Sequence, residues 1–452
     1  MDSYDKFMGM KIPLWLFLLF LLLGLLAIVG FGWAVQNFLS GGNRTKPYSK
    51  AIMAVATFPD LAKASLEQVV SAISGWTQEA DAGATGLVRD QKFTDTGYLL
   101  LSTFDSRNIT RVKLLRLSDG RIMHQWMLTD EEARRIDPNT DMAPAGQPLF
   151  QPIHPLLLKD GSIIGANEGP LMKLDRCSRV QWAKRGTFHH AIEESNDGTF
   201  WVSGVLTPST LDASIYPELR DDSIVQMSLH GEILQQRSVA RILVDNGYQA
   251  LLFGVGAYDQ DPVHLNEIQP VLSTAKHWQR GDVFLSSRHR SSVFLYRPSE
   301  NRIVWLKTGP WMNQHDVEMV NDHTISVFGN DVIRLRPETL KVIPSPVNYT
   351  YARGHSTVYL YNFDTGEVFR PYDKILAKLK LGMIAAGRSK VLPNGDVYVD
   401  DVVAGRVFRT SPEQVRWTYT LDATIANMSW SRYLSAEEVA PALPHLNCPR
   451  SQ

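Results

Sequence analysis

The chain of 452 residues has little cysteine, almost no net charge and only one long apolar segment. Its 47 acidic and 46 basic side chains leave a formal charge of −1, which gives no electrostatic reason to expect a nucleic-acid partner. The two cysteines, Cys177 and Cys448, permit at most one disulfide in an oxidising compartment, and two free thiols are the alternative. A content of 44% hydrophobic and 21% charged residues is that of a globular protein with a large core.

The long apolar segment runs from Ile12 to Val35 and contains no charged residue. A bilayer span needs about 20 such residues, whereas the apolar part of a secretory signal has about 7 to 15. Trp15 and Trp33 lie near its two ends, as interfacial anchors do. We therefore predict an N-terminal tail at 1–11 and an uncleaved transmembrane anchor at 12–36, with a cleaved signal as the alternative.

The residues between this anchor and the first strands, 37–94, are predicted to form a linker and a short helical neck. Apolar residues recur there at three- and four-residue steps between Ala51 and Trp76. An amphipathic helix that lies on the membrane surface is the alternative for this segment.

From about Gly97 onward, short apolar strands alternate with turns rich in Gly, Asn and Asp. We count six units of roughly 40 to 50 residues with about four strands each, which is typical of propeller blades. A blade cannot bury both of its faces alone, so the ring must close. The prediction is an all-β fold: a six-bladed β-propeller at 95–435, preceded by the transmembrane helix and the neck, and followed by a C-terminal tail at 436–452.

Four of the predicted blades open with a histidine at the same step of the repeat, and the sixth places Arg388 there. These histidines are His154, His190, His264 and His315. One step of a repeat faces one point on the propeller axis, so the four imidazoles are expected to line one mouth of the central channel. One histidine at a strand start is more often a hydrogen-bonded core residue, but four in one column favour a functional site.

An arginine lies next to this column in sequence, within the block Ser286-Ser287-Arg288-His289. A guanidinium binds tetrahedral oxyanions through paired hydrogen bonds better than an ammonium group does. The alternative for Arg288 is a surface salt bridge. Three histidines outside the column are predicted to be mainly structural: His189, His289 and His323.

Taken together, His190, His264-Leu-Asn266, Ser286-Ser-Arg-His289 and Gln314-His315 resemble the bacterial arylsulfotransferase family. The resemblance covers most of the chain after about residue 95. It implies a six-bladed propeller that acts outside the cytoplasm and needs no nucleotide sulfate donor. It also implies a ping-pong reaction, in which an aryl sulfate passes its sulfuryl group to a histidine and a phenol or another hydroxyl group then accepts it.

The resemblance implies a nucleophile and three residues that bind the sulfuryl oxygens: His315, and then His190, His264 and Arg288. Three further residues are predicted to bind substrate: His154, Asn266 and Arg388. A neutral imidazole is a competent nucleophile near pH 7, and a neighbouring guanidinium should lower its pKa. Asn266 and Asp316 are expected to orient the site, and neither a metal nor a cofactor is expected.

Enterobacterial members carry an extra N-terminal β domain and a cleaved signal, whereas this chain is predicted to have an anchor and a neck. We therefore predict a divergent, membrane-anchored branch with its propeller on the periplasmic or another extracytoplasmic side. The expected partners are the aryl sulfate, the hydroxyl acceptor and the membrane; a second copy of the chain or a membrane complex is left open.

Two other functions remain open from the sequence. Four histidines on a propeller axis can bind iron, as in carotenoid-cleaving oxygenases, although those have seven blades. Arg288 argues against this function, since a guanidinium repels a dication. The chain could also be a non-catalytic propeller that docks in a membrane complex, because a fold alone does not fix a function.

Overall fold

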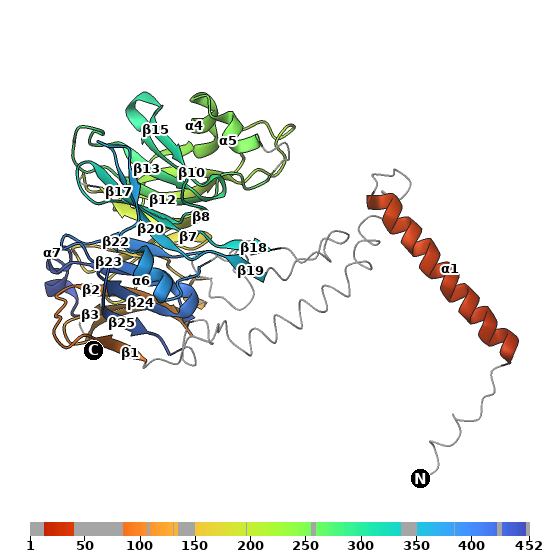
Figure 1. The fold of residues 1–452 in the computed structure, drawn as a ribbon, viewed down its shortest axis with the longest axis horizontal. Coiled ribbons are helices and arrows are strands. Elements are labelled where there is room, and N and C mark those ends of the chain that lie inside the picture. The colour runs from red at the N-terminus through yellow and green to blue at the C-terminus, as the bar shows by residue number, and fades with distance from the viewer. Residues whose placement is uncertain are drawn as a thin grey trace, which may run out of the picture. The chain divides into compact units, whose positions relative to one another are not determined.

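The computed structural model contains an N-terminal helix and a large β unit (Figure 1). It describes residues 13–39, 85–105, 109–129, 131–133, 150–195, 197–254, 259–335, 350–383, 385–422 and 427–448. The predicted N-terminal tail, the neck, most of the linker and the loop at 336–349 lie outside the described residues.

Helix α1 (Leu14–Leu39) is built almost entirely from apolar residues. Its stretch Leu14–Ala34 is long and apolar enough to cross a membrane, and none of this stretch is buried against protein. An exposed apolar helix near the N-terminus fits a membrane anchor and also fits a signal sequence, so both alternatives of the sequence analysis stand.

The β unit consists of antiparallel sheets whose strands mostly follow one another along the chain. The first contains β2 (Tyr98–Phe104), β3 (Ile109–Arg116) and β4 (Ile122–Thr129). Another contains β12 (Leu265–Pro270), β13 (Val283–Ser287), β14 (Ser292–Arg297) and β15 (Arg302–Thr308). A third contains β16 (Asp316–Met319), β17 (Thr324–Gly329), β20 (Thr357–Asn362) and β21 (Val368–Phe369). A fourth contains β22 (Arg388–Val391), β23 (Val397–Asp401), β24 (Arg406–Thr410) and β25 (Val415–Thr420).

A longer sheet of seven strands contains β5 (Leu156–Leu157), β6 (Ile163–Gly165), β7 (Gly169–Leu174), β8 (Val180–Glu194), β9 (Thr199–Leu206), β10 (Asp221–Ser228) and β11 (Ile233–Ser238). Strand β8 has 15 residues, and its first part pairs with β7 while its last part pairs with β9. The fold is therefore all-β and propeller-like, as predicted. The count of six blades stays a prediction, since this sheet is continuous in its hydrogen bonding.

Smaller elements decorate these sheets. Strands β18 (Ile333–Leu335) and β19 (Thr350–Arg353) form a two-stranded ribbon. Besides α1, the described helices are α4 (Val239–Asp245), α5 (Gln249–Phe253), α6 (Asp373–Lys378), α7 (Ala436–Val439) and the short 3-10 turns η2 (Arg288–Arg290), η3 (Pro298–Glu300), η5 (Val402–Ala404) and η6 (Leu443–His445).

Both ends of the β unit are closed by strands from the opposite end of the chain. Strand β1 (Gly86–Arg89) pairs with β25, so an early segment extends the last sheet. Strands β26 (Asn427–Met428) and β27 (Arg432–Leu434) pair with β2, so a late segment completes the first sheet. The predicted domain boundaries stay predictions, but β1 lies before the predicted start at residue 95.

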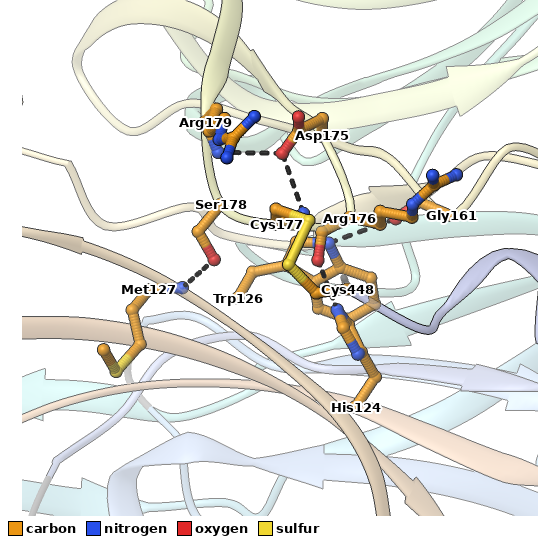
Figure 2. The surroundings of a disulfide bond; sticks show 10 residues. All are labelled: His124, Trp126, Met127, Gly161, Asp175, Arg176, Cys177, Ser178, Arg179 and Cys448. Atoms are coloured by element: carbon orange, nitrogen blue, oxygen red, sulfur yellow. Dashed lines mark hydrogen bonds between the residues drawn. A yellow bond between two sulfur atoms is a disulfide. The ribbon is translucent and has the colours of Figure 1, made fainter. Parts of the chain in front are cut away.

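A disulfide joins Cys177, in the turn between β7 and β8, to Cys448 in the C-terminal tail (Figure 2). Their Cα atoms lie 5.3 Å apart, which is an ordinary disulfide separation. Close by, Ser178 Oγ accepts a hydrogen bond from the Met127 amide at 3.0 Å, which ties this turn to β4. Of the two alternatives for the cysteines, the structure therefore has the pair.

Apolar side chains fill the space between neighbouring sheets. Ile325 and Val327 of β17, for example, pack in one cluster with Phe284 and Leu295 of the preceding sheet. Strand β2 is buried along its whole length, whereas the outer strand β4 is partly exposed. This packing fixes the innermost strands, which carry the candidate site.

Candidate functional site

The histidines of the column lie at the starts or irregularities of the innermost strands. His154, His190 and His264 have φ angles of 49°, 53° and 50°, a left-handed backbone that is uncommon for a residue other than glycine. The register of β8 against β9 shifts just beyond His189, and the register of β12 against β13 shifts after Leu265. Such bulges re-aim side chains, and here they recur at one step of the repeat.

Three of the four histidines come together with a tryptophan from the closing strands. The ring centre of His190 lies 5.4 Å from that of His264 and 6.4 Å from that of His315. The Trp430 ring lies 5.3 Å from His190 and 5.7 Å from His315. His315 is buried, and the other two histidines are half-buried. We call His190, His264, His315 and Trp430 the imidazole cluster.

Each histidine of this cluster has its Nδ1 atom in a hydrogen bond. His315 Nδ1 lies 2.5 Å from Asn330 Oδ1, and His264 Nδ1 lies 2.5 Å from Asp261 Oδ2. His190 Nδ1 lies 2.8 Å from Nδ1 of the neighbouring His189. These contacts fix three ring orientations from three different partners: an amide, a carboxylate and an imidazole.

The environment holds two of these imidazoles in the neutral form. Burial lowers the pKa of His315 well below its usual value, and the Arg288 guanidinium lowers it further. Burial, and then the neighbouring imidazoles of His189, His264 and His315, lower the pKa of His190 well below its usual value. The direction for His315 is the one that the sequence predicts, and a neutral imidazole has a ring nitrogen with a free lone pair for nucleophilic attack.

Arg288 lies beside the cluster at the start of η2. Its backbone N–H donates to the His264 carbonyl at 3.1 Å, which ties η2 to the start of β12. His289 stacks on His264 with ring centres 4.3 Å apart and an interplanar angle of 24°. The Arg288 guanidinium also acts electrostatically on His315, so the structure brings Arg288 near the other three residues predicted to be catalytic.

Asn266 is fully buried and lies behind the cluster. Its Nδ2 donates to the Gln314 carbonyl at 3.2 Å, and Gln314 Nε2 donates to the carbonyls of Ser287 and Ser292. Asn266 thereby holds the backbone just before His315. This arrangement suits the orienting role expected from the sequence.

Arg388 belongs to a second group of buried side chains instead of the imidazole column. Its guanidinium nitrogens lie 3.2 Å from Asp316, 3.5 Å from Glu193 and 3.6 Å from Glu318, and a nitrogen also contacts Glu267. Glu193 in turn lies 2.9 Å from Arg432. We call Glu193, Glu267, Asp316, Glu318, Arg388 and Arg432 the ionic cluster.

His154 lies against the ionic cluster. Its Nδ1 lies 3.1 Å from Glu193 and 2.9 Å from Arg432, and among the described residues it makes no ring contact with the other three column histidines. The expectation that His154 shares one mouth of the channel with the other three stays a prediction. Arg432 of the closing strand β27 lies beside His154.

Asp316 likewise has a different partner from the one that an orienting group for His315 needs. Its Oδ2 accepts from the Ser389 amide at 2.8 Å, and its Oδ1 faces Arg388. Asp316 thus links β16 to β22 within the ionic cluster.

The carboxylates of the ionic cluster outnumber its guanidinium groups, and their pKa values diverge. Burial raises the pKa of Glu318 to about 8, and burial also raises the pKa of Glu267 and Asp316. Burial disfavours ionisation of Glu193 too, but Arg432 and His154 outweigh it and hold the pKa of Glu193 well below its usual range. The cluster therefore holds protons at neutral pH.

The ionic cluster is not among the groups predicted from the sequence, although the sequence contains a signal for it. The motif His-x-x-Glu occurs three times, at 190–193, 264–267 and 315–318. In a regular strand, residues three apart point to opposite faces, but the register shifts in β8 and β12 alter this alternation. Trp430 and Asn330 had no such signal, since neither belongs to a repeated motif.

Among the described residues, two groups of side chains have the spacing to hold a metal ion: Glu168, His189 and His190, and Asp261, His264 and His289. In each group one ligand atom per residue lies within 4.8 Å of the others. Several of these atoms are engaged in hydrogen bonds, including His264 Nδ1 with Asp261 and His289 Nδ1 with the Asp261 carbonyl at 2.6 Å.

Fold and site together define a propeller-like protein with a histidine and arginine site on its innermost strands. A family model described as arylsulfotransferase (ASST) matches residues 154–421, which is more than half of the chain. The chain therefore belongs to the arylsulfotransferase family. No curated protein sequence matches it.

Several solved structures are similar at low identity. A protein of unknown function from Bacteroides caccae is 11% identical, with a TM-score of 0.47 and coverage of 75% of this chain and 99% of that one. The Neurospora crassa Pan2 WD40 domain is 10% identical, with a TM-score of 0.39 and coverage of 78% and 94%. Kuenenia stuttgartiensis hydrazine synthase is 11% identical, with a TM-score of 0.36 and coverage of 75% and 81%.

Proposed function

We propose that this chain is a membrane-anchored sulfotransferase that moves a sulfuryl group from an aryl sulfate to a phenolic or other hydroxyl acceptor through a sulfohistidine. The observation that carries the proposal is the convergence of His190, His264 and His315 beside Arg288, in a chain that belongs to the arylsulfotransferase family. In this proposal the seven-stranded sheet counts as two blades that share β8, which gives six blades.

In the first half-reaction, the Nε2 lone pair of His315 forms a bond to sulfur. The bond from sulfur to the aryl oxygen breaks, and its electron pair leaves with the aryloxide. Sulfuryl transfer resembles phosphoryl transfer, in which the enzyme mainly positions groups and stabilises charge on oxygen. Arg288, with the N–H group of His190, binds the sulfuryl oxygens, and Asn266 holds the backbone of the nucleophile. His264 has its Nδ1 hydrogen toward Asp261 and keeps its Nε2 lone pair for the acceptor proton.

In the second half-reaction, the acceptor oxygen attacks sulfur, the bond from sulfur to His315 breaks, and its electron pair returns to Nε2. The acceptor must lose its proton, and His264 receives it. The Asp261 carboxylate, 2.5 Å from His264 Nδ1, stabilises the imidazolium that forms.

The predicted extracytoplasmic location has support from two features. Helix α1 is long enough to anchor the chain in a membrane. The disulfide between Cys177 and Cys448 favours an oxidising compartment, because thiols stay reduced in the cytoplasm.

The deciding experiment measures the release of nitrophenol from 4-nitrophenyl sulfate by the detergent-solubilised full chain. The wild-type protein is expected to give a burst without acceptor, turnover with a phenol, and a sulfated peptide that contains His315.

In His315→Ala the rate of the nitrophenol burst should fall about 1,000-fold or more, since this variant lacks the attacking nitrogen. His323→Ala, an exposed histidine outside the cluster, is the matched control and should keep it. A wild-type protein without burst and without sulfated peptide would support a non-catalytic role in a membrane complex.

A metal-dependent propeller is the second candidate, and the two histidine–carboxylate groups favour it. Metal analysis of the purified chain distinguishes the two functions. A stoichiometric metal that is lost in a variant with His264→Ala and His289→Ala would favour the metal-dependent function, whereas a metal-free protein with full nitrophenol release supports sulfuryl transfer.

A further inference from the structure

Asn330 follows β17 and lies buried against His315. Its Oδ1 is 2.5 Å from His315 Nδ1. Its Nδ2 donates to the carbonyls of Met383 and Ala386, both at 2.9 Å. Because two carbonyl oxygens take the amide hydrogens, only the amide oxygen can face the imidazole. The orientation of this amide is therefore fixed by the backbone of another segment.

This orientation determines where His315 carries its hydrogen. An amide oxygen only accepts hydrogen bonds, so Nδ1 must donate. In a neutral imidazole Nε2 then bears the lone pair. An independent contact agrees: the Ala386 N–H donates to Nε2 at 2.9 Å. Two partners on opposite sides of the ring thus specify one tautomer.

His264 offers a comparison with the same geometry and a different partner. Its Nδ1 has the Asp261 carboxylate at 2.5 Å, where His315 has an amide oxygen at the same distance. A carboxylate stabilises a protonated ring, whereas an amide oxygen adds no charge. The amide suits a ring that must stay neutral to attack, and the carboxylate suits a ring that receives a proton.

We propose that Asn330 is a positioning residue that holds His315 with its hydrogen on Nδ1 and so presents the Nε2 lone pair for the bond to sulfur. The inference rests on the proposed function. The Ala386 N–H occupies this lone pair in the free protein, so this hydrogen bond has to break before Nε2 attacks sulfur. The ring becomes cationic in that step, and the hydrogen bond from Nδ1 to Asn330 then strengthens.

The charged and titratable groups that face His315 agree with a neutral ring. Arg288 and His264 both disfavour its protonation, and His190 lies on another side of the ring. Among the described residues, no carboxylate makes a hydrogen bond to the His315 ring. Replacing Asn330 by aspartate would therefore place a negative charge next to Nδ1 of His315, where the wild-type protein has a neutral amide.

The test compares Asn330→Ala and Asn330→Asp with Ser356→Ala as the matched control. Ser356 is fully buried; its Oγ donates to the Asn330 carbonyl at 2.9 Å and accepts from the Met383 amide at 2.8 Å. Ser356 therefore connects the segments of Asn330 and Met383, as the Asn330 side chain does, but it makes no hydrogen bond to the His315 ring. A loss of stability alone should therefore appear in Asn330→Ala and in Ser356→Ala alike.

The first readout is the nitrogen NMR spectrum of histidine-labelled full chain in detergent, with His315 assigned through His315→Gln. Wild type and Ser356→Ala should show the His315 ring with hydrogen on Nδ1. Asn330→Ala should show a mixture of tautomers, and Asn330→Asp should show a doubly protonated ring at neutral pH. This readout needs no turnover, so it stands even if no sulfate donor is found.

The second readout is the pH dependence of the nitrophenol burst. Asn330→Ala should lower the burst rate by about 10- to 100-fold, as loss of an orienting partner usually does. Asn330→Asp should move the acid limb to higher pH, and Ser356→Ala should leave it in place. An unchanged His315 tautomer in Asn330→Ala, or one common pH profile for all three variants, overturns the positioning role. Absence of any burst in the wild type, with the expected NMR result, would instead overturn the proposed function.

Discussion

The imidazole cluster and the ionic cluster use the same innermost strands, only three residues apart, yet they differ in how they carry charge. His190 and His315 are held neutral because burial opposes their protonation and Arg288 adds to that effect at His315. In the ionic cluster, the arginines hold the pKa of Glu193 low, so Glu193 keeps its charge. Burial raises the pKa of the other three carboxyl groups, which are Glu267, Asp316 and Glu318. The difference shows that burial favours the neutral form wherever the nearby opposite charge is too small to offset it, and one Arg388 guanidinium is shared among several carboxyl groups.

Trp430 contacts both clusters and comes from neither of their repeated motifs. Its ring packs against His190 and His315, and the Arg388 guanidinium lies 5.9 Å from its centre. Trp430 therefore contacts members of both clusters and adds no ionisable group to either. The following predictions change the charge of one cluster at a time.

The largest expected effect is in the ionic cluster. Arg388→Met should lower the free energy of unfolding by about 3–5 kcal/mol, because it leaves buried carboxyl groups without their main counterion. Chemical denaturation of the full chain in detergent measures it. The matched control is Arg302→Met, which removes an exposed arginine paired with Glu300 and should cost less than about 1 kcal/mol. Equal losses in the two variants would contradict the role given to Arg388.

A carboxylate placed in the imidazole cluster should convert it toward the ionic type. His190→Glu is expected to raise the pKa of His315 and to lower the nitrophenol burst at pH 7 at least about 10-fold below that of His190→Gln. The neutral glutamine is the control, since both variants lose the same imidazole. The burst of His190→Glu should recover as the pH rises. If the two variants give the same rate at every pH, charge in this cluster does not govern the nucleophile.

The smallest effect concerns the pH dependence of stability. The pKa of Glu318 is about 8 in the folded chain and lies near its ordinary value when unfolded. The folded state therefore binds a proton more tightly, so this contribution is full below about pH 4.5 and is lost as the pH rises through 8. Glu318→Gln should flatten the fall in melting temperature between pH 5 and 8. The exposed Glu367→Gln should keep the wild-type slope, and a parallel slope in Glu318→Gln would contradict the raised pKa.

The repeat of strands and turns was sufficient to predict an all-β propeller-like unit, because period-two alternation and turn residues are local properties. The convergence of His190, His264 and His315 was also predictable, since one step of a repeat faces one point on the axis. The repeated motif His-x-x-Glu also contains the glutamates of the ionic cluster. That these side chains point toward one another depends on register shifts in β8 and β12, which no local sequence pattern reveals.

The partners of His154 and Arg388 were not predictable from the sequence, and both depend on one feature of the fold. The innermost strands of the first sheet come from the last part of the chain, β26 and β27, which bring Trp430 and Arg432 to the axis. Arg432 contacts His154 directly, and Glu193 contacts His154, Arg432 and Arg388. A pairing between strands more than 300 residues apart leaves no signature in either segment by itself.

The sequence by itself determined the kind of fold, the apolar N-terminal helix and the column of imidazoles, because each of these follows from spacing along the chain. Only the tertiary structure decided which partners His154 and Arg388 have, which nitrogen of His315 faces Asn330 and that the two cysteines meet. Those three outcomes depend on hydrogen bonds, charges and a covalent bond between distant segments, and such contacts exist only once the sheets have packed into a ring.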